Sequence, residues 1–309
     1  MMRPEILCLG EPLVEFVRET GTTEPLYRRG FGGDTSNAAI AAARQGASVG
    51  YITAVGTDSF GDSLMALWKA EGVDTTGVTR NPEAPTGIYF VDPDPDGRFF
   101  TYFRTGSAAS LLTPKDLPLD DLRGAKVLHL SGITLAVSAG MRASAFSAIG
   151  AAASGGAAIS VDTNLRLKLW PAKEARTVLT RAMAMARVAV TSLDDSTALL
   201  GLTDARAVAA AYRAMGPEIV LVTMGGAGAW VSAGDEGALI PALPATPVDS
   251  TGAGDSFAGA FLAWWLELGD AVEAARRAAI VAAGTVSGFG AVEPIPRRAE
   301  VLACRSGAA

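Results

Sequence analysis

Asp249-Ser-Thr-Gly-Ala-Gly-Asp255 runs directly into the apolar segment Ser256-Phe-Ala-Gly-Ala-Phe-Leu-Ala-Trp-Trp-Leu266, which predicts a glycine-rich loop followed by a helix. Backbone N–H groups in the first turn of a helix have no partner within the helix and lie at the positive end of its dipole. Small Gly252, Ala253 and Gly254 would let a phosphate approach these groups, so the loop is a candidate anion hole. Asp255 could accept the proton of an attacking hydroxyl. Taken alone, the loop is also explained by Asp255 acting as an ordinary N-cap.

Short apolar runs bounded by polar or turn residues precede this loop, as is typical of buried parallel strands. They occupy residues 6–9, 127–130, 158–161, 188–190 and 219–222. Alanine-rich stretches that favour helix lie at residues 35–44, 138–153, 172–186 and 205–215. The alternation predicts an α/β fold with one central sheet between two helical layers, a three-layer α/β/α sandwich.

Two segments, residues 11–33 and 86–102, interrupt the alternation. In the second, Gly87-Ile-Tyr-Phe-Val91 and Arg98-Phe-Phe-Thr-Tyr102 flank Asp92-Pro-Asp-Pro-Asp-Gly97, which predicts a β-hairpin. A hairpin with no helix beside it must cover another surface, so we expect a small β-sheet lid. Because no linker interrupts the composition, residues 1–309 are predicted to form one domain with lid segments at about 11–33 and 86–104.

Composition narrows the class of partner and the chemistry. A net charge of -6 and a pI near 5.0 provide no basic stripe for nucleic acid or an anionic membrane, so small-molecule partners are expected. Two cysteines and the absence of a recognisable targeting or membrane-spanning segment favour the reducing cytoplasm. The single histidine, His129, alternates with leucines as a sheet residue does, which excludes a Ser/His/Asp triad and a His-rich metal site.

Two further glycine clusters follow or precede predicted elements. Thr223-Met-Gly225-Gly226-Ala-Gly228 follows the run 219–222, as a turn beside a nucleotide would, although a tight β-hairpin explains the same pattern. Gly32-Gly33 precedes the helix predicted at 35–44, so the backbone at Gly33 could approach a ligand closely. Helix capping by Asp34 or Thr35 also explains that pattern, but it does not explain Asn37, one turn into the helix.

Together, Gly32-Gly33 with Asn37, Asp162-Thr-Asn164-Leu-Arg166, the Thr223 cluster and the Asp249–Asp255 loop resemble the ribokinase (PfkB) family of carbohydrate kinases. The resemblance covers residues 6–301 and implies that family's sandwich with a β lid. It also implies that Asp255 is the general base, that Gly252, Ala253 and Gly254 form the catalytic anion hole, and that Mg²⁺ arrives with ATP. The residues that it places beside ATP are Asn164, Ser192, Thr223, Gly225, Gly226 and Gly228.

One motif departs from the family pattern. The usual Asn-x-x-Glu, which helps organise phosphate and magnesium, stands here as Ser192-Leu-Asp-Asp195, so the metal role falls to the shorter Asp195. Some members also hold a monovalent cation near the segments equivalent to Asp249 and to residues 287–289. The sequence gives no ligand set that can be counted, so this cation is left open.

Within the family, Gly10-Glu-Pro-Leu-Val14, Tyr102-Phe-Arg104 and Leu130-Ser-Gly-Ile133 are most similar to 2-keto-3-deoxygluconate kinases. The similarity implies ATP-dependent conversion of 2-keto-3-deoxygluconate to 2-keto-3-deoxy-6-phosphogluconate. A sugar acid needs a positive, forked donor, which Arg104 or Arg166 could supply. The residues implied to surround it are Gly33, Asn37, Tyr89, Tyr102, Arg104, Ile133, Arg166 and Asp255.

The alternative is a fructokinase or ribokinase-type enzyme for a neutral sugar, in which Arg104 is a solvated residue at a strand end. The lid also suggests a homo-oligomer. Tyr89, Val91, Phe99 and Phe100 are candidates for an exposed apolar side of the lid that would pair with a second copy.

Overall fold

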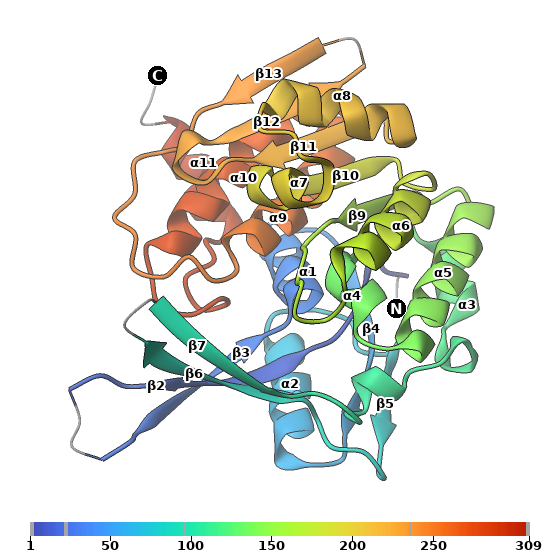
Figure 1. Ribbon diagram of the computed structural model, residues 1–309, viewed down its shortest axis with the longest axis vertical. Helices are drawn as coiled ribbons and strands as arrows, with labels where there is room; N and C mark the ends of the chain where they lie inside the picture. Colours follow the sequence, from blue (N-terminus) through green and yellow to red (C-terminus); the bar gives the residue numbers. More distant parts are fainter. Residues whose placement is uncertain (1–2, 22–23, 95–96, 235, 307–309) are drawn as a thin grey trace.

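The computed structural model of the protein describes residues 3–21, 24–94, 97–234 and 236–306. Within these residues, nine strands form a large sheet and four form a small one (Figure 1). The large sheet has the order β13-β12-β11-β10-β9-β8-β1-β4-β5, and the small sheet has the order β3-β2-β6-β7.

The large sheet is parallel from β5 to β11 and ends in two antiparallel strands, β12 and β13. Its strands are β1 Ile6–Leu9, β4 Val49–Gly56, β5 Val78–Asn81, β8 Val127–Ser131, β9 Ala158–Asp162, β10 Val188–Ser192, β11 Ile219–Thr223, β12 Ala229–Ala233 and β13 Glu236–Ile240. The central strands are buried along almost their whole length, because helices cover both faces of the sheet.

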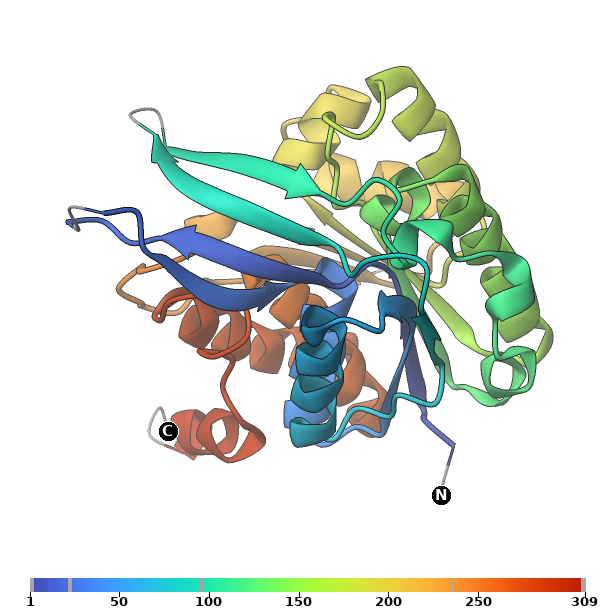
Figure 2. The ribbon, with the colours of Figure 1, turned by 90° about the horizontal axis from the view of Figure 1, so that it is seen from below.

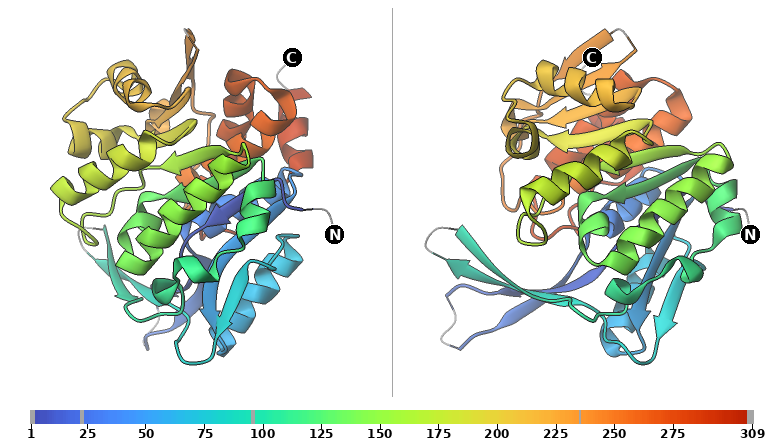
Figure 3. Two further views of the ribbon diagram at one scale, coloured as in Figure 1. Left: turned by 90° about the vertical axis from the view of Figure 1, so that its right-hand side faces the viewer. Right: turned by 45° about the vertical axis from the view of Figure 1, so that its right-hand side comes forward.

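The helices form one layer on each face of the large sheet (Figure 3). One layer contains α1 Asp34–Arg44, α2 Ser59–Ala70, α9 Ala253–Leu268, α10 Ala271–Val286 and α11 Arg298–Ser306. The other contains α3 Leu119–Gly124, α4 Gly132–Ala136, α5 Ala139–Ser154, α6 Ala172–Met183, α7 Leu193–Leu200 and α8 Ala205–Met215. Short 3₁₀ turns lie at Ala109–Leu111, Pro114–Asp116 and Gly225–Ala227. No helix of the described residues has the length and apolar character needed to cross a bilayer.

Alternation along the strands divides the core between the two helical layers. In β1, Ile6 and Cys8 pack into the cluster that includes α1, α9 and α10, whereas Leu7 and Leu9 pack into the cluster that includes α5 and α6. Successive side chains of a strand point to opposite faces, so each strand contributes to both cores. The predicted three-layer α/β/α sandwich is therefore confirmed.

The predicted strands and helices agree with the structure apart from small shifts at their ends, but the prediction did not include β13, α3, α4, α7, α10 or α11. The five predicted strands are β1 and β8 to β11, and the last four extend by one or two polar residues. Helix α6 ends at Met183 rather than at residue 186. The prediction also did not include β4, β5 or α2, although β4 is fully buried beside β1. Two glycines and Thr53 interrupt the apolar character of β4, so its sequence lacks a continuous run.

The small sheet is the lid, and it projects from the sandwich (Figure 2). Its strands are β2 Leu13–Arg18, β3 Tyr27–Gly32, β6 Ile88–Asp94 and β7 Gly97–Phe103. The predicted hairpin is the antiparallel pair of β6 and β7, in which Tyr89 lies opposite Tyr102. Residues 95 and 96, at the centre of the predicted Pro/Asp/Gly loop, lie outside the described residues.

The prediction of the lid's exposed apolar side was wrong for three of its four residues, because Phe100 is half-buried and packs with Tyr89 and Val91, whereas Phe99 is 56% exposed. Tyr89 and Val91 are 5% and 2% exposed and pack with Leu13 on the side of the lid that faces the site. The opposite side carries Phe90, which contacts other aromatic rings, and Phe103, which is 61% exposed. Tyr89 and Val91 share one side because the side chains of a strand alternate, and the sequence alone does not tell which side turns inward.

Candidate active site

Four neighbouring strands of the large sheet each have a polar last residue, and these residues lie at one edge of the sheet. Strands β8, β9, β10 and β11 end at Ser131, Asp162, Ser192 and Thr223. Because these strands are parallel and in register, their last residues gather at the carboxyl edge, where open α/β sheets bind ligands. The lid begins at the same edge, since β2 follows the end of β1 after residues 10–12.

Asp255 lies at this edge, in the first turn of α9. Asn37, from the first turn of α1, donates its side-chain amide to Asp255 Oδ2 at 2.9 Å. Asn164, from the loop after β9, donates to Asp255 Oδ1 at 3.3 Å. Both carboxylate oxygens are therefore oriented by amides from separate elements. Asn37 was predicted to contact the substrate, and in the structure its amide donates to Asp255.

Asn164 has a backbone conformation suited to this bridging position. Its φ is 27°, which makes it the one residue other than glycine with a positive φ among the described residues. Its backbone N–H donates to Asp162 Oδ1 at 3.0 Å, and its amide also donates to Asp34 Oδ2 at 3.2 Å. Asparagine tolerates this region better than most residues, and such departures often occur at functional sites.

The surroundings of Asp255 raise the pKa of its carboxyl above the ordinary value of an aspartate. Burial is the main cause that raises the pKa of Asp255 to about 6, and the negative charge of Asp34 is the second. The hydrogen bond from Asn37 lowers the pKa and offsets part of this rise. Burial likewise raises the pKa of Asp34. A carboxylate with a pKa near 6 is ionised at neutral pH and is still a better proton acceptor than an ordinary aspartate.

The glycine-rich loop before Asp255, which was predicted to form an anion hole, leads directly into the first turn of α9. Gly252 caps α9 in the left-handed region with a φ of 78°, and a Cβ there would lie 2.8 Å from the carbonyl oxygen of Ala291. Gly254 is exposed, with open space where a side chain would be. Ala253 N–H already donates to the Ser250 carbonyl oxygen at 3.3 Å, so the N–H of Gly254 is the better placed donor.

The loop is braced from behind by the segment that follows α10. Asp249 is buried, and its Oδ1 accepts hydrogen bonds from the Thr251 N–H at 3.0 Å and hydroxyl at 2.7 Å. Its Oδ2 accepts from the Gly290 N–H at 3.2 Å. Asp249 thus connects the glycine-rich loop to the segment after α10. These are the two segments near which the sequence left the binding of a monovalent cation undecided.

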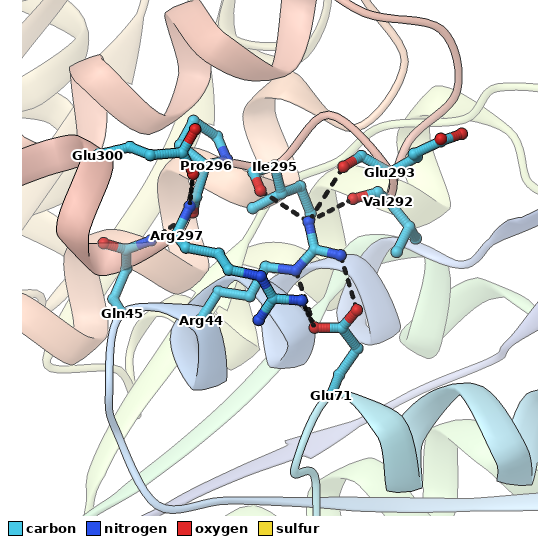
Figure 4. A network of polar contacts seen from close by, with 9 residues as sticks. All are labelled: Arg44, Gln45, Glu71, Val292, Glu293, Ile295, Pro296, Arg297 and Glu300. Carbon is cyan, nitrogen blue, oxygen red and sulfur yellow. Dashed lines mark hydrogen bonds and ion pairs between the residues drawn. The ribbon is translucent and has the colours of Figure 1, made fainter.

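Arg44, the last residue of α1, holds the same segment further along (Figure 4). Its guanidinium pairs with Glu71 through Nη2 at 2.7 Å and Nε at 2.9 Å. Its Nη1 donates to the carbonyl oxygens of Val292, Glu293 and Ile295. Both side chains of the ion pair are less than one-tenth exposed. Helix α1 therefore orients Asp255 at one end and anchors the segment behind Gly252 at the other.

Aromatic side chains of the lid lie together beside the site. Tyr89 donates its hydroxyl to Glu15, and its ring stacks on Tyr102 with ring centroids 5.4 Å apart. The Arg104 guanidinium lies over the Tyr102 ring at 5.3 Å. Burial is the main cause that raises the pKa of Tyr89, and the negative charges of Glu15 and Asp255 add to the rise. The structure thus brings together Tyr89, Tyr102 and Arg104, as predicted.

Arg104 is paired with Glu11, a residue outside the predicted site. Arg104 Nη2 donates to Glu11 Oε2, and the Glu11 side chain has no exposed surface. Gly33, predicted to contact a ligand, lies against the Glu11 backbone with a φ of 109°. A Cβ at Gly33 would lie 2.6 Å from the Glu11 carbonyl oxygen, so only glycine fits.

The two remaining residues predicted to contact the sugar lie at the rim of the site. Arg166 is exposed, and its positive charge opposes the rise in the pKa of both Asp34 and Asp255. Ile133 is half-buried in the first turn of α4, two residues after the end of β8. Arg166 is therefore the more solvent-accessible of the two predicted arginines.

Two of the residues predicted to bind nucleotide or metal, Ser192 and Asp195, lie at the end of β10 and in the first turn of α7. Ser192 caps α7, and its hydroxyl accepts the Asp195 N–H at 3.0 Å. Asp195 Oδ2 accepts hydrogen bonds from the Thr163 hydroxyl at 3.0 Å and the Leu165 N–H at 2.9 Å. One oxygen of Asp195 is thus committed to the loop that carries Asn164.

The glycine cluster after β11 forms the predicted tight hairpin. Thr223 donates its hydroxyl to the Thr191 carbonyl oxygen at 3.3 Å, and β11 pairs with β12 in antiparallel register. Gly225 and Gly228 have φ values of 56° and 94°, and Gly225 and Gly226 have open space around them. The absence of side chains at Gly225 and Gly226 leaves room for a ligand to approach the backbone of this turn.

His129 has the structural role predicted for it. It is buried in β8 with its Nδ1 3.0 Å from the Ser160 hydroxyl oxygen, and burial lowers its pKa to about 4. It is therefore neutral at physiological pH.

Sequence reasoning missed three acidic residues of the site. Glu11 stood only within a quoted motif, Asp34 was interpreted as a helix cap, and Asp162 belonged to a motif without an assigned role. Burial, and then the neighbouring carboxylates of Asp255 and Asp195, raise the pKa of Asp162 well above its ordinary value. Their positions in the chain could have identified two of them, because Glu11 and Asp162 lie at the carboxyl ends of β1 and β9, where open α/β sheets bind ligands.

Comparisons with known proteins identify the sequences and structures to which this chain is similar. Residues 3–298 match the model of the pfkB family carbohydrate kinases. A 2-dehydro-3-deoxygluconokinase from Thermoproteus tenax is 34% identical over 96% of this chain and 93% of its own length. Fructokinase-1 from Zea mays is 32% identical over 97% of each chain. A crystal structure of a putative Ribokinase II from E. coli, in complex with ATP and Mg²⁺, superposes with a TM-score of 0.90 at 26% identity, covering 98% of this chain and 99% of that one.

Proposed function

Because this chain belongs to the pfkB family of carbohydrate kinases and is a sugar kinase, we propose that it phosphorylates 2-keto-3-deoxygluconate with ATP, giving 2-keto-3-deoxy-6-phosphogluconate. The observation that carries the proposal is the Asp255 carboxylate, oriented by Asn37 and Asn164 beside a glycine-rich helix start. The name of the T. tenax relative supports the substrate, since 2-dehydro-3-deoxygluconate and 2-keto-3-deoxygluconate are one compound.

Asp255 is the general base of the proposed reaction. The terminal hydroxyl of the sugar acid gives its proton to Asp255, and the hydroxyl oxygen bonds to the γ-phosphorus of ATP. The bond between that phosphorus and the bridging oxygen breaks, and ADP leaves with the electron pair. N–H groups of the first turn of α9, with Gly254 foremost, stabilise the charge on the transferred group.

The acidic side chains near Asp255 fit a magnesium ion that accompanies the nucleotide. Asp162 lies among the like charges of Asp255 and Asp195, a cluster that a divalent cation would stabilise. Among the residues that the structure describes, no three His, Cys, Asp or Glu side chains can hold a metal by themselves. Asp195 and Asp162 would therefore supply part of the ligand shell, and phosphate oxygens and water the rest. The ion would screen the charge of the phosphates.

The substrate carboxylate is assigned to the two arginines. Arg104 lies over the ring of Tyr102, and Arg166 lies near Asp34 and Asp255. Guanidinium groups bind carboxylates with two parallel hydrogen bonds, which a neutral sugar cannot accept in the same way.

A neutral sugar is the second candidate, and one specific observation favours it. Glu11 already neutralises Arg104, so the pocket carries less positive charge than the sequence suggests. A coupled assay of ADP release over 2-keto-3-deoxygluconate, 2-keto-3-deoxygalactonate, fructose and ribose separates the candidates. We expect the sugar acids to give the higher kcat/KM; equal or better turnover of fructose contradicts the proposal.

A further inference from the structure

Glu11 is a buried carboxylate that depends on a single cation. It follows β1 in the turn to the lid, and its side chain has no exposed surface. Its Oε2 accepts from Arg104, and its Oε1 has no hydrogen-bond partner among the described residues. A buried carboxylate in this position stays ionised only while its cation compensates for the lost hydration.

Arg104 is the same residue to which the substrate carboxylate is assigned. Its side chain is 12% exposed, and its Nε has no hydrogen-bond partner among the described residues. The guanidinium extends from Glu11 to the ring of Tyr102, which belongs to the lid. A sugar acid bound here would bring a second anion to one guanidinium, in surroundings where water does not screen the repulsion.

The groups that face Glu11 do not relieve this repulsion. Arg104 contacts Glu11 directly, and Tyr102 of the lid, Asp34 of α1 and Tyr51 of β4 interact with it electrostatically. Burial raises the pKa of both tyrosines, so neither ionises or gives up a proton near neutral pH. Asp34 adds a negative charge. Burial raises the pKa of Glu11 to about 7 even with Arg104 in place, so the carboxyl can accept a proton in the physiological range.

We propose that Glu11 takes up one proton from solvent when the carboxylate of the sugar acid engages Arg104, so that sugar-acid binding is coupled to protonation of Glu11 and weakens in alkaline solution. An O–H bond forms at the Glu11 carboxyl as Arg104 turns to the ligand, and the proton returns to solvent when the product leaves. This inference rests on the proposed function. Only an anionic substrate would cause this proton uptake, because a neutral sugar brings no second anion to Arg104.

Isothermal titration calorimetry of the full chain measures the coupling. 2-Keto-3-deoxygluconate is titrated at pH 8 in phosphate and in Tris, whose ionisation enthalpies differ, and the difference in heat gives the number of protons taken up. We expect about one proton per site in the wild type, since Glu11 is mostly ionised at that pH, and almost none in Glu11→Gln. Glu15→Gln is the matched control, because it removes another buried carboxylate that pairs with Tyr89 rather than Arg104.

The outcomes separate this inference from the proposed function. Binding without proton uptake in the wild type refutes the role of Glu11, and so does undiminished uptake in Glu11→Gln. Loss of uptake in Glu15→Gln to the same extent also refutes it, because the effect would then not be specific to the partner of Arg104. If the sugar acid does not bind while fructose does, the proposed function fails and the inference with it. The wild-type measurement decides the question even if Glu11→Gln does not fold.

Discussion

The role of Asn37 can be tested through the pH dependence of the reaction. Its amide donates to Asp255 Oδ2 at 2.9 Å and is itself buried, so Asn37→Ala removes a hydrogen bond to a charged group. Such a bond stabilises the ionised acceptor by about 1.5–3 kcal/mol. Because one pKa unit corresponds to about 1.4 kcal/mol, the pKa of Asp255 should rise by about one to two units.

The sign of the effect follows from the role of the base. Asp255 must be ionised to accept a proton, and its pKa is already raised to about 6, so kcat/KM should fall below that pH about tenfold for each pH unit. In Asn37→Ala the fall should begin near pH 7 to 8 instead, by the hydrogen-bond magnitude given above. The activity lost at neutral pH should then be partly recovered at higher pH.

The measurement is kcat/KM from pH 5 to 9 for both proteins, with the thermal unfolding midpoint as a control for folding. The fit of the acidic limb gives the pKa directly. An acidic limb that stays near pH 6 while KM rises at every pH would refute the reasoning. It would show instead that Asn37 contacts the substrate, as the sequence suggested.

Three further changes test the base, the support of the loop and the lid. Asp255→Asn should lower kcat by about 10²–10⁴ while the Kd of the sugar acid, measured by calorimetry, stays within about tenfold; retained turnover would exclude Asp255 as the base. Arg44→Met should destabilise the fold by about 3 kcal/mol in urea unfolding, because the Glu71 side chain stays buried and Arg297, at 3.4 Å, is then its one ion-pair partner among the described residues. A loss below about 1 kcal/mol would contradict this. Phe103→Asp should convert the predicted homo-oligomer to monomers in light scattering, since Phe103 is 61% exposed on the lid. An unchanged mass would exclude pairing through this side.

Local patterns were sufficient to predict most of the sandwich. Buried parallel strands contain continuous apolar runs, so β1 and β11 were recognisable without tertiary information. Strand β4 was not, because its buried position comes from its neighbours β1 and β5 rather than from its own composition. The predicted ends of β8, β9, β10 and β11 were one or two residues too early. Their last residues are polar, and they belong to the site as much as to the sheet.

Long-range pairing accounts for the parts of the site that the sequence could not provide. Arg104 and Glu11 are 93 positions apart, and Asn37 and Asp255 are 218 apart, so no local pattern joins either pair. The glycine-rich loop predicted where the base would be, but not which amides orient it. The lid shows the same limit, since alternation separated Tyr89 from Phe90 without indicating which of them turns inward.

Close packing of two helices sets the position of the base. Gly259 of α9 lies against the backbone of Ala38 in α1, and a Cβ on Gly259 would collide with the Ala38 carbonyl oxygen. The two helices can therefore approach closely enough for Asn37, next to Ala38, to reach Asp255, one turn before Gly259. Because α1 also anchors the segment behind Gly252 through Arg44, the base and the loop beside it are positioned by one helix. The site depends on the packing of α1 against α9 as much as on the glycine-rich motif itself.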